Sequence, residues 1–455
     1  MVFSGTPFLY FYLPLVLAAY YLTPLRFRNG VLLVFNLIFY GWGEPVYLWI
    51  MLLTIAINHG AGLLIDRHRS RGKPILILAV VLNLALLFFF KYWNMAAGIL
   101  PFLPDLDVTL PIGISFYTFQ AMSYTIDVYR RDAAAAPNPV NFATYITLYP
   151  QLIAGPIVRY KDVADQMEQR EHSSAIFAAG VQSFVAGLCK KILLGNNLGQ
   201  LWEFYRDLPK GELTGLGAWL GILAFTLQIY FDFSGYSDMA VGLGRMLGLE
   251  FLPNFNYPYI AKSVTEFWRR WHMSLGTWFR DYVYVPLGGN QVGKVRLCVN
   301  LMLTWGLTGL WHGASWNFLL WGLYFGVLLI VEKLFLGKAL KALPPTLAHL
   351  YTLLLVIISW VLFAVEDFSV MLRYLAALFG QAAGYAAQDG YMLRSYALML
   401  VVAVVAATPL AAGVRKRLPE RLCQPLTALL LLAGLLLSTA YIVDAAYNPF
   451  LYFRF

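Results

Sequence analysis

The residue best suited by its type and position to take part in a reaction is a histidine inside a long apolar stretch. In segment 297–331, LCVNLMLTWGLTGLWHGASWNFLLWGLYFGVLLIV, His312 is the only titratable side chain besides Cys298 and Tyr324. Sixteen residues separate it from Arg296. They span about 24 Å of helix, which is less than the ~30 Å of a hydrocarbon core. We therefore expect His312 to lie inside the membrane, where ionisable groups are costly and mark functional sites.

The residues that follow His312 predict a break between two helices. Gly313 can end one helix, and Ser315 can cap the next. Unpaired backbone at membrane depth is tolerated only inside protein or beside a cavity, so the break predicts a cavity at His312. His312 is then a candidate for acid–base chemistry, and the alternative is a structural histidine bonded to a neighbouring carbonyl.

A second candidate, His272, lies in the aromatic segment 262–289. Apolar residues recur there at helical spacing, and the arginines fall largely off that stripe: Trp268, Trp271, Leu275, Trp278 and Tyr282 against Arg269, Arg270 and Arg280. This pattern predicts an amphipathic helix in the plane of the interface that does not cross the membrane. His272 shares the apolar face, either as a stacked anchor or as a supporting group at a reaction centre.

Two carboxylates lie in a third polar site within apolar sequence. Asp232 and Asp238 flank Gly235 in the run FDFSGYSDMAVG at 231–242. Paired carboxylates can carry out acid–base chemistry. They can also accept bonds from arginine or backbone N–H groups and hold a helix break together, and we favour this structural role.

Several other kinds of site are excluded or disfavoured. The remaining histidines have no metal-ligand spacing with another His, Cys or carboxylate, so we expect no metal site: His59, His68, His172 and His349. The three cysteines are far apart and give no disulfide framework, although an acyl-thioester role for one stays open. Phosphate-cradling glycine loops and a Gly-x-Ser-x-Gly elbow do not occur in the sequence.

The composition indicates a membrane protein. Apolar residues make up 60% of the 455 positions and charged residues 13%, roughly half the ~25% share of soluble domains. The net charge of +9 lies in short clusters between apolar runs. Such clusters are typical of cytoplasmic loops, and we expect no nucleic-acid partner. We find no internal repeat, which disfavours a transporter built from paired halves.

The apolar runs predict an all-α polytopic fold with about eleven transmembrane helices plus interfacial and re-entrant helices, in a single domain over 1–455. The expected helices lie near 7–24, 30–43, 45–65, 74–93, 110–129, 140–158, 174–195, 213–246, 297–311, 315–334, 346–365, 391–411 and 424–445. The helix at 213–246 is long enough to hold a break. Basic clusters at Arg26 and Arg28, Arg67–Lys73, and Lys190 and Lys191 are expected to face the cytoplasm, which leaves the N-terminus outside.

Taken together, these motifs resemble the membrane-bound O-acyltransferase family, and within it the membrane subunits that O-acetylate bacterial alginate. The resemblance is carried by Phe231–Gly242, the Phe-Trp-Arg-Arg-Trp-His run in 266–289, Trp311-His312-Gly313, Met1–Ser4, Gly113–Gln120, Gln151–Pro156 and Tyr452–Phe455. It is dense over 105–320, the expected catalytic core, and thin from 330 to 445.

The resemblance implies a funnel that holds the active site within the membrane, with His312 as the catalytic histidine and His272 as a second polar site residue. Trp311, Asn317 and Arg269, with the two aspartates, are expected to support the site or line a substrate channel. It further implies no bound cofactor, a cytoplasmic thioester donor such as acetyl-CoA, extracytoplasmic partner acetyltransferases, and location in the bacterial cytoplasmic (inner) membrane.

The chemistry of the residue types fits this implication. Acyl transfer to a hydroxyl needs a base, and neutral imidazole titrates near pH ~6.5. His272 or a backbone N–H is expected to stabilise the oxyanion. Two alternatives stay open: acylation of peptidoglycan, teichoic acid or another exopolysaccharide, and transport of a polysaccharide precursor.

Overall fold

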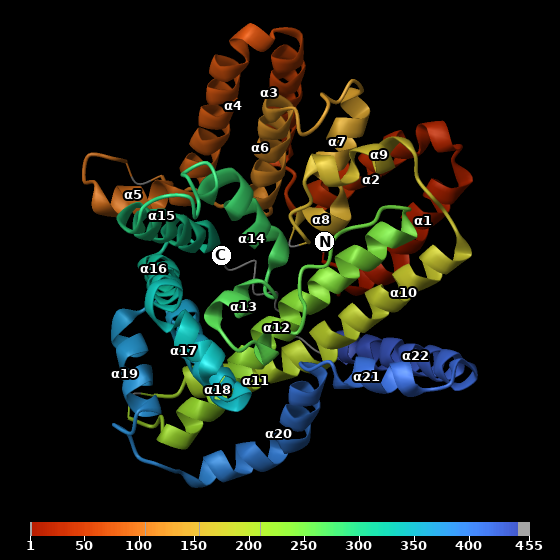
Figure 1. Ribbon diagram of the computed structural model, residues 1–455. Coiled ribbons are helices and arrows are strands. Elements are labelled where there is room, and N and C mark those ends of the chain that lie inside the picture. The colour runs from red at the N-terminus through yellow and green to blue at the C-terminus, as the bar shows by residue number, and fades with distance from the viewer. Residues whose placement is uncertain (1, 105, 154, 210, 445–455) are drawn as a thin grey trace. The chain divides into compact units, whose positions relative to one another are not determined.

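The computed structural model describes residues 2–104, 106–153, 155–209 and 211–444, and every regular element in these ranges is helical (Figure 1). The predicted all-α fold is confirmed. Eight of the described helices are long and apolar enough to cross a membrane, and two shorter apolar helices cover Phe8–Leu22 and Phe368–Leu378. The count of about eleven crossings stays a prediction. Met1, Ala154 and Tyr452–Phe455, which belong to the motifs above, lie outside the described residues.

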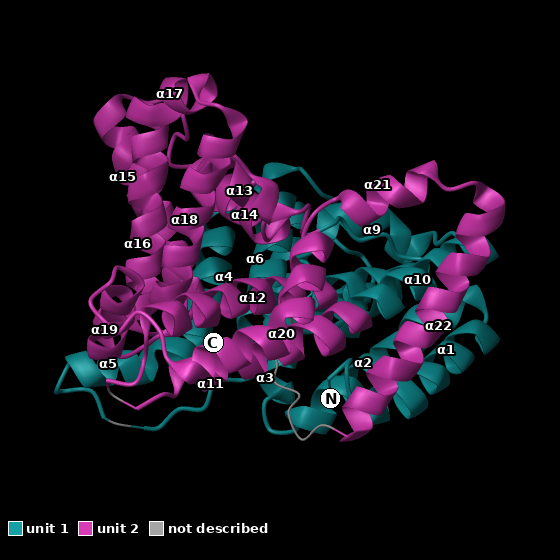
Figure 2. Ribbon diagram, turned by 90° about the horizontal axis from the view of Figure 1, so that it is seen from below, with its two compact units in different colours: residues 1–187, 236–253 teal, residues 188–235, 254–455 magenta. Residues whose placement is uncertain are grey.

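The chain divides into two compact units, shown in different colours in Figure 2. Unit 1 comprises residues 1–187 and 236–253, and unit 2 comprises residues 188–235 and 254–455. The single domain over 1–455 stays a prediction. His272 and His312 both belong to unit 2.

Unit 1 is built from the N-terminal helices. They are α1 (Leu13–Leu22), α2 (Arg28–Gly43), α3 (Leu48–Arg67), α4 (Gly72–Leu87), α5 (Trp93–Ile99), α6 (Ile114–Arg130), α7 (Pro139–Thr147), α8 (Tyr149–Leu152), α9 (Tyr160–Glu168) and most of α10 (Ser174–Cys189). A reciprocal pair of buried amides joins α3 to α4, since Asn58 and Asn83 each donate to the other's Oδ1 at 2.9 and 3.1 Å. Such bonds hold apolar helices together where lipid provides no hydrophobic drive.

The single helix predicted over 140–158 is wrong, because the chain forms α7 and α8 with a break at Leu148. Proline inside a helix removes a hydrogen bond and clashes with the preceding turn, but it is tolerated in the first turn. The helix therefore ends at Thr147 and restarts with Pro150 in the first turn of α8.

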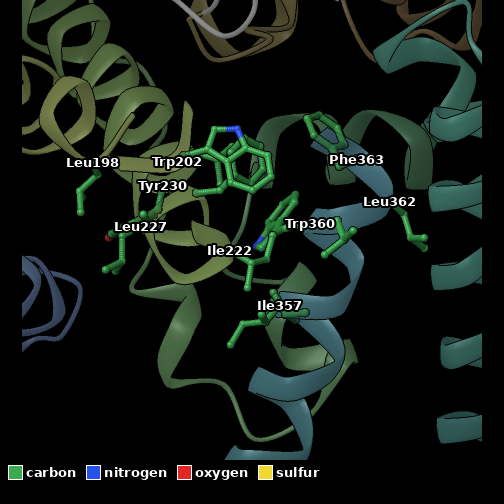
Figure 3. Close-up of a cluster of buried hydrophobic side chains, with 14 of the residues drawn as sticks. Leu198, Trp202, Ile222, Leu227, Tyr230, Ile357, Trp360, Leu362 and Phe363 are labelled. Atoms are coloured by element: carbon green, nitrogen blue, oxygen red, sulfur yellow. The ribbon is translucent and has the colours of Figure 1, made fainter. Parts of the chain in front are cut away.

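Unit 2 contains the remaining helices. They are α11 (Asn196–Arg206), α12 (Gly215–Met246, whose last turns belong to unit 1), α13 (Val264–Trp268), α14 (Met273–Phe279), α15 (Lys294–His312), α16 (Trp316–Val331), α17 (Gly337–Ala342), α18 (Pro345–Ala364), α19 (Phe368–Leu378), α20 (Ala387–Ala406), α21 (Leu410–Arg417) and α22 (Glu420–Asp444). Its core is aromatic and aliphatic, and Figure 3 shows Trp202 and Tyr230 on one side of it and Trp360 and Phe363 of α18 on the other.

The hairpin of α15 and α16 depends on two facing glycines. A Cβ atom on Gly309 would lie 2.2 Å from the Phe318 carbonyl oxygen, and one on Gly322 would lie 2.3 Å from the Trp305 carbonyl oxygen. Only glycine allows the two backbones to approach this closely. The close packing fixes the end of α15, where His312 lies.

A buried carboxylate joins the end of α16 to the start of α13. Glu332, 3% exposed, accepts hydrogen bonds from the backbone N–H groups of Val264 (2.7 Å) and Thr265 (2.9 Å) and from the Thr265 hydroxyl (2.7 Å). These donors belong to the first turn of α13, which has no intrahelical acceptors for them. The position of α13 is thus tied to α16.

Two further sequence predictions are corrected in unit 2. The segment 262–282 is not one amphipathic helix, because α13 ends at Trp268 and α14 begins only at Met273. Its stripe is buried in protein, with Trp271 and Trp278 each 3% exposed, since the broken chain can turn both halves inward. Lys190 and Lys191 do not form a loop, because a π-helical turn over Lys190–Gly195 continues α10 into α11.

Replacing Glu332 by alanine leaves the first-turn N–H groups of α13 buried without their acceptor. We expect a loss of roughly 1.5–3 kcal/mol for the charge-assisted bonds. The melting temperature of Glu332→Ala in detergent should fall clearly, whereas Glu366→Ala, at an exposed carboxylate, should leave it unchanged. Equal melting temperatures for both variants would mean that Glu332 does not hold α13.

Candidate active site

Two histidines from separate elements of unit 2 meet in its interior. His272 is 1% exposed and His312 is 4% exposed, and their ring centroids lie 6.5 Å apart. They are 40 residues apart in the sequence and sit on different helix ends, at the start of α14 and the end of α15. The structure therefore brings together the two histidines that the sequence singled out.

The helix break predicted after His312 is confirmed, although its details differ. Gly313 is extended, with φ −167° and ψ 152°, so no left-handed conformation requires glycine there. Glycine is needed at this position for steric reasons, because a Cβ atom would lie 2.3 Å from the Phe318 ring. Ser315 precedes α16 without capping it, because its hydroxyl donates instead to Asn317 Oδ1 at 2.6 Å.

Asn317 holds the break against α18. Its Nδ2 donates to the carbonyls of Leu362 (3.3 Å) and Phe363 (3.1 Å) in the last turn of α18, and the side chain is fully buried. Carbonyls in that turn lack intrahelical donors, so Asn317 satisfies them. Its position therefore supports the site from outside, and a role as a channel residue stays a prediction.

Aromatic rings form the walls around His312. The ring centroids of Trp321, Trp311 and Phe363 lie 5.0, 5.1 and 5.5 Å from that of the imidazole, and Trp321 and Phe363 meet it edge to face. Trp311 also lies 6.0 Å from His272. These apolar walls exclude water, so electrostatic interactions at the two histidines are stronger than in bulk solvent.

The backbone at His272 is in the left-handed region, with φ 44° and ψ 54°. Such a conformation is uncommon for a residue other than glycine and stores roughly 1–3 kcal/mol of strain. It is held by residue 254 through two contacts: Met273 N donates to the Asn254 carbonyl at 2.9 Å, and His272 Nδ1 lies 3.2 Å from Asn254 Oδ1. The Phe233 ring packs edge-on against the imidazole at 4.7 Å.

The bonds around Asn254 decide the tautomer of neutral His272. Asn254 Oδ1 also accepts from the backbone N–H of Ser274 (3.1 Å) and from its hydroxyl (2.9 Å), and a backbone N–H can only donate. The atom facing His272 is thus an oxygen, so Nδ1 carries the proton and Nε2 carries the lone pair. A neutral His272 is therefore an acceptor at Nε2, which does not fit the oxyanion-donor role considered from the sequence.

A pocket of about 160 Å³ opens beside His272 between α14 and α15. It is mostly apolar, and its lining residues are Trp268, His272, Leu275, Gly276, Phe279, Arg280, Tyr284, Leu301, Thr304, Trp305 and Thr308. The sequence predicted a cavity at His312, but the residues that line this pocket include His272 and not His312, so a cavity at His312 itself stays a prediction. A small acyl group and its thioester sulfur fit within this volume.

The two aspartates do not form an acid–base pair at the histidines. Asp232 forms a buried ion pair with Lys191 at 2.9 Å, and Lys191 also donates to Asn196. Asp238 is half-buried and lies on the part of α12 that belongs to unit 1. Contrary to expectation, α12 runs unbroken through both residues. Asp232 is thus paired with a lysine and holds no helix break, and the roles of both aspartates stay predictions.

The other candidates lie away from the histidine pair. Arg269 is exposed and lines a separate, larger cavity. His59 and His349 are bonded to the carbonyls of Ala136 and Ala261, both at 3.1 Å, and His172 lies 3.3 Å from the Tyr20 hydroxyl. Within the described ranges, no group of three or more His, Cys, Asp or Glu residues could hold a metal ion.

Sequence reasoning missed the residues that position the site. Asn254 and Glu332 contact their partners across 18 and 68 residues, respectively, and neither belongs to a periodic pattern. Lys191 was assigned to a loop, although a lysine inside the apolar run 174–195 signals a buried partner. No local signal indicates which partner that is.

Comparison with known proteins decides the family. The membrane-bound O-acyltransferase (MBOAT) family matches residues 34–374. The chain belongs to this family. It is 44% identical over 393 residues to the probable alginate O-acetylase AlgI of Azotobacter vinelandii, and the match covers 83% of this chain and 78% of that relative. It is also 44% identical to the probable alginate O-acetylase AlgI of Pseudomonas aeruginosa, and that match covers 83% of this chain and 75% of the relative. It is 30% identical to the peptidoglycan O-acetyltransferase of Helicobacter pylori, with 84% and 80% covered.

These relatives and the family assignment make the chain an O-acyltransferase and a multi-pass membrane protein. The enzyme class disfavours the transporter alternative. The roles of His312, His272 and the supporting residues of this MBOAT enzyme stay predictions.

Gly313→Ala provides a direct test of the packing at the break. The added Cβ must displace the Phe318 ring, which packs edge-to-face against Phe363 with ring centroids 5.0 Å apart, and Phe363 is a wall of the His312 site. We expect at least a tenfold loss of acyl transfer and a lower melting temperature, since overpacking costs roughly 1–3 kcal/mol. Gly413→Ala is the matched control, because a Cβ there meets nothing within 4 Å. Unchanged activity in Gly313→Ala would show that the ring position is irrelevant to the site.

Proposed function

We propose that this protein moves acetyl groups from a cytoplasmic thioester donor, acetyl-CoA in the simplest case, toward an extracytoplasmic polysaccharide such as alginate. The observation that carries the proposal is the buried pair of His272 and His312, of which His272 lines a pocket of about 160 Å³. Similarity to two alginate O-acetylases over 83% of the chain supports the polymer.

In the proposed reaction, His312 acts as general base toward a hydroxyl group of the acceptor. The hydroxyl O–H bond breaks as its proton moves to the imidazole, and the oxygen forms a bond to the acetyl carbon. The carbon–sulfur bond of the thioester then breaks, and the imidazolium returns the proton to the leaving thiolate. Imidazole is suited to both steps because the unperturbed group titrates near pH ~6.5 and can both take up and release a proton.

His272 is proposed to orient the acceptor. Its Nδ1–H is directed to Asn254, so Nε2 is the ring nitrogen that can accept a hydrogen bond from a hydroxyl group. Because the reacting hydroxyl gives its one proton to His312, Nε2 of His272 would accept from a second hydroxyl of the acceptor and so align the acceptor before bond formation. The oxyanion donor is then a different group, and the indole N–H of a pocket tryptophan is the kind of donor that fits.

The immediate acceptor is proposed to belong to a partner acetyltransferase outside the cytoplasm, which passes the acetyl group to the polymer. Peptidoglycan is the second candidate polymer, because the chain is 30% identical to a peptidoglycan O-acetyltransferase over 84% of its length. The two candidates differ in the final acceptor and share the same chemistry at the histidines.

If His312 is the base, His312→Ala should lower acetyl transfer from labelled acetyl-CoA by roughly 10²–10⁴-fold per folded molecule. Donor affinity should persist, since proton transfer is exercised in the transition state. Folding is scored by monodispersity and melting temperature, with His312→Gln as the variant that preserves more of the packing.

His349→Ala is the matched control, because that histidine is bonded to a carbonyl away from the site. Wild-type turnover by well-folded His312→Ala would refute the assignment. Activity that falls only in proportion to folded protein, in both His312 variants, would mean a structural histidine.

The proposed orientation in the bacterial cytoplasmic membrane has the N-terminus outside and the Arg67–Lys73 loop inside. Ser70 is exposed at the start of the 31-residue helical segment Arg69–Ile99, and Thr109 is exposed beyond its end. In a background without native cysteines, an impermeant thiol reagent should label Thr109→Cys from outside intact cells and leave Ser70→Cys unlabelled. The reverse pattern would overturn the orientation.

A further inference from the structure

A second cavity, of about 1120 Å³, lies in unit 2 at the ends of α16 and α17. Its lining is strongly basic, with five cationic side chains against two carboxylates: Lys262, Arg269, Lys333, Lys338 and Lys341 against Glu266 and Glu332. Apolar side chains complete the wall, among them Leu329, Phe335 and Leu343. The cavity thus combines a cluster of positive charge with an apolar surface.

Both carboxylates are already engaged by groups of the fold. Glu332 accepts three hydrogen bonds from the start of α13. Glu266 accepts from the Lys262 backbone N–H (3.0 Å) and pairs with Arg270 (2.9 Å). Burial acts to raise the pKa of Glu266, but these donors outweigh it and hold the pKa below its ordinary value. The five cationic side chains therefore leave the cavity with excess positive charge.

The basic cavity and the small pocket beside His272 share part of their lining. Tyr284 and Leu301 contribute to both. A ligand in the basic cavity therefore lies next to the pocket that ends at His272. The Lys333 ammonium group lies near the Tyr284 hydroxyl and Asn290, so one cation of the cavity is held beside Tyr284, which lines both spaces.

We propose that the basic cavity is a binding site for clustered phosphate groups carried on an apolar or narrow chain. Lysine and arginine side chains recognise phosphate oxygens through charge-assisted hydrogen bonds, and the apolar wall accommodates the attached chain. Two sources supply this chemistry: the nucleotide end of the acyl donor, which rests on the proposed function, and the headgroup of an anionic phospholipid, which does not.

The test uses full-length protein in which Lys338→Gln and Lys341→Gln are combined. Both lysines are exposed on α17, so the fold is preserved. The control combines Lys416→Gln and Arg417→Gln on α21, which makes the same change in net charge outside the cavity. Binding of CoA, dephospho-CoA and pantetheine is measured by calorimetry in detergent.

If the donor is the source, the Lys338/Lys341 variant binds CoA roughly tenfold more weakly than wild type, with a shallower salt dependence. The control variant binds CoA as wild type does. Affinity falls from CoA to dephospho-CoA to pantetheine in the wild type, and this difference narrows in the variant.

If a lipid is the source, CoA affinity is the same in all three proteins, and the lipid measurement separates them. Native mass spectrometry from nanodiscs containing cardiolipin and phosphatidylcholine then shows cardiolipin retained by wild type and control but lost from the Lys338/Lys341 variant. If neither CoA nor cardiolipin distinguishes the variant from the control, the phosphate site is refuted.

A phosphate-free donor separates this proposal from the proposed function. Acetyl transfer from S-acetyl-N-acetylcysteamine needs the histidines but no phosphate contact. The Lys338/Lys341 variant should use this donor as well as wild type does. Absence of transfer from any thioester in the wild type would refute the proposed function and leave the phosphate site to be judged by binding.

Discussion

The active site depends on two breaks in helical backbone, one before His272 and one after His312. Each break exposes polar backbone groups in an apolar interior, where unpaired groups cost several kcal/mol. Two asparagines provide partners near these breaks. Asn254 accepts from the Met273 N–H through its backbone carbonyl and from the Ser274 N–H through its side chain, and the Asn317 side chain donates to the last carbonyls of α18. With those groups satisfied, the two imidazoles can lie 6.5 Å apart.

The charges of unit 2 are arranged around that apolar centre. Lys191 and Asp232 neutralise each other on the α11–α12 side, and Phe233, the next residue, packs on His272. Glu332 ties α13 to α16, so the segment that leads to His272 and the hairpin that carries His312 are held together. Breaking such a buried charged contact leaves an uncompensated charge, which explains why the fold retains it.

The sequence predicted the helices and both histidines, because these rest on local patterns. Apolar runs predict spans, and His312 stands almost alone in one of them. Contacts between residues far apart in the sequence could not be predicted from local patterns. Lys191, the partner of Asp232, was expected in a loop, and Asn254 belongs to no periodic pattern. The aromatic periodicity of 267–282 was real, but it predicted one helix because periodicity does not reveal the break at residues 269–272.

The central claim is that His272 and His312 act on one acceptor molecule as a unit. A double-mutant cycle of His272→Gln, His312→Gln and the combined variant, read as acetyl transfer per folded molecule, tests it most directly. Residues that act as a unit are strongly non-additive, so the combined variant should be about as inactive as the worse single variant. Losses that multiply in the combined variant would contradict the account, because the two rings would then contribute independently.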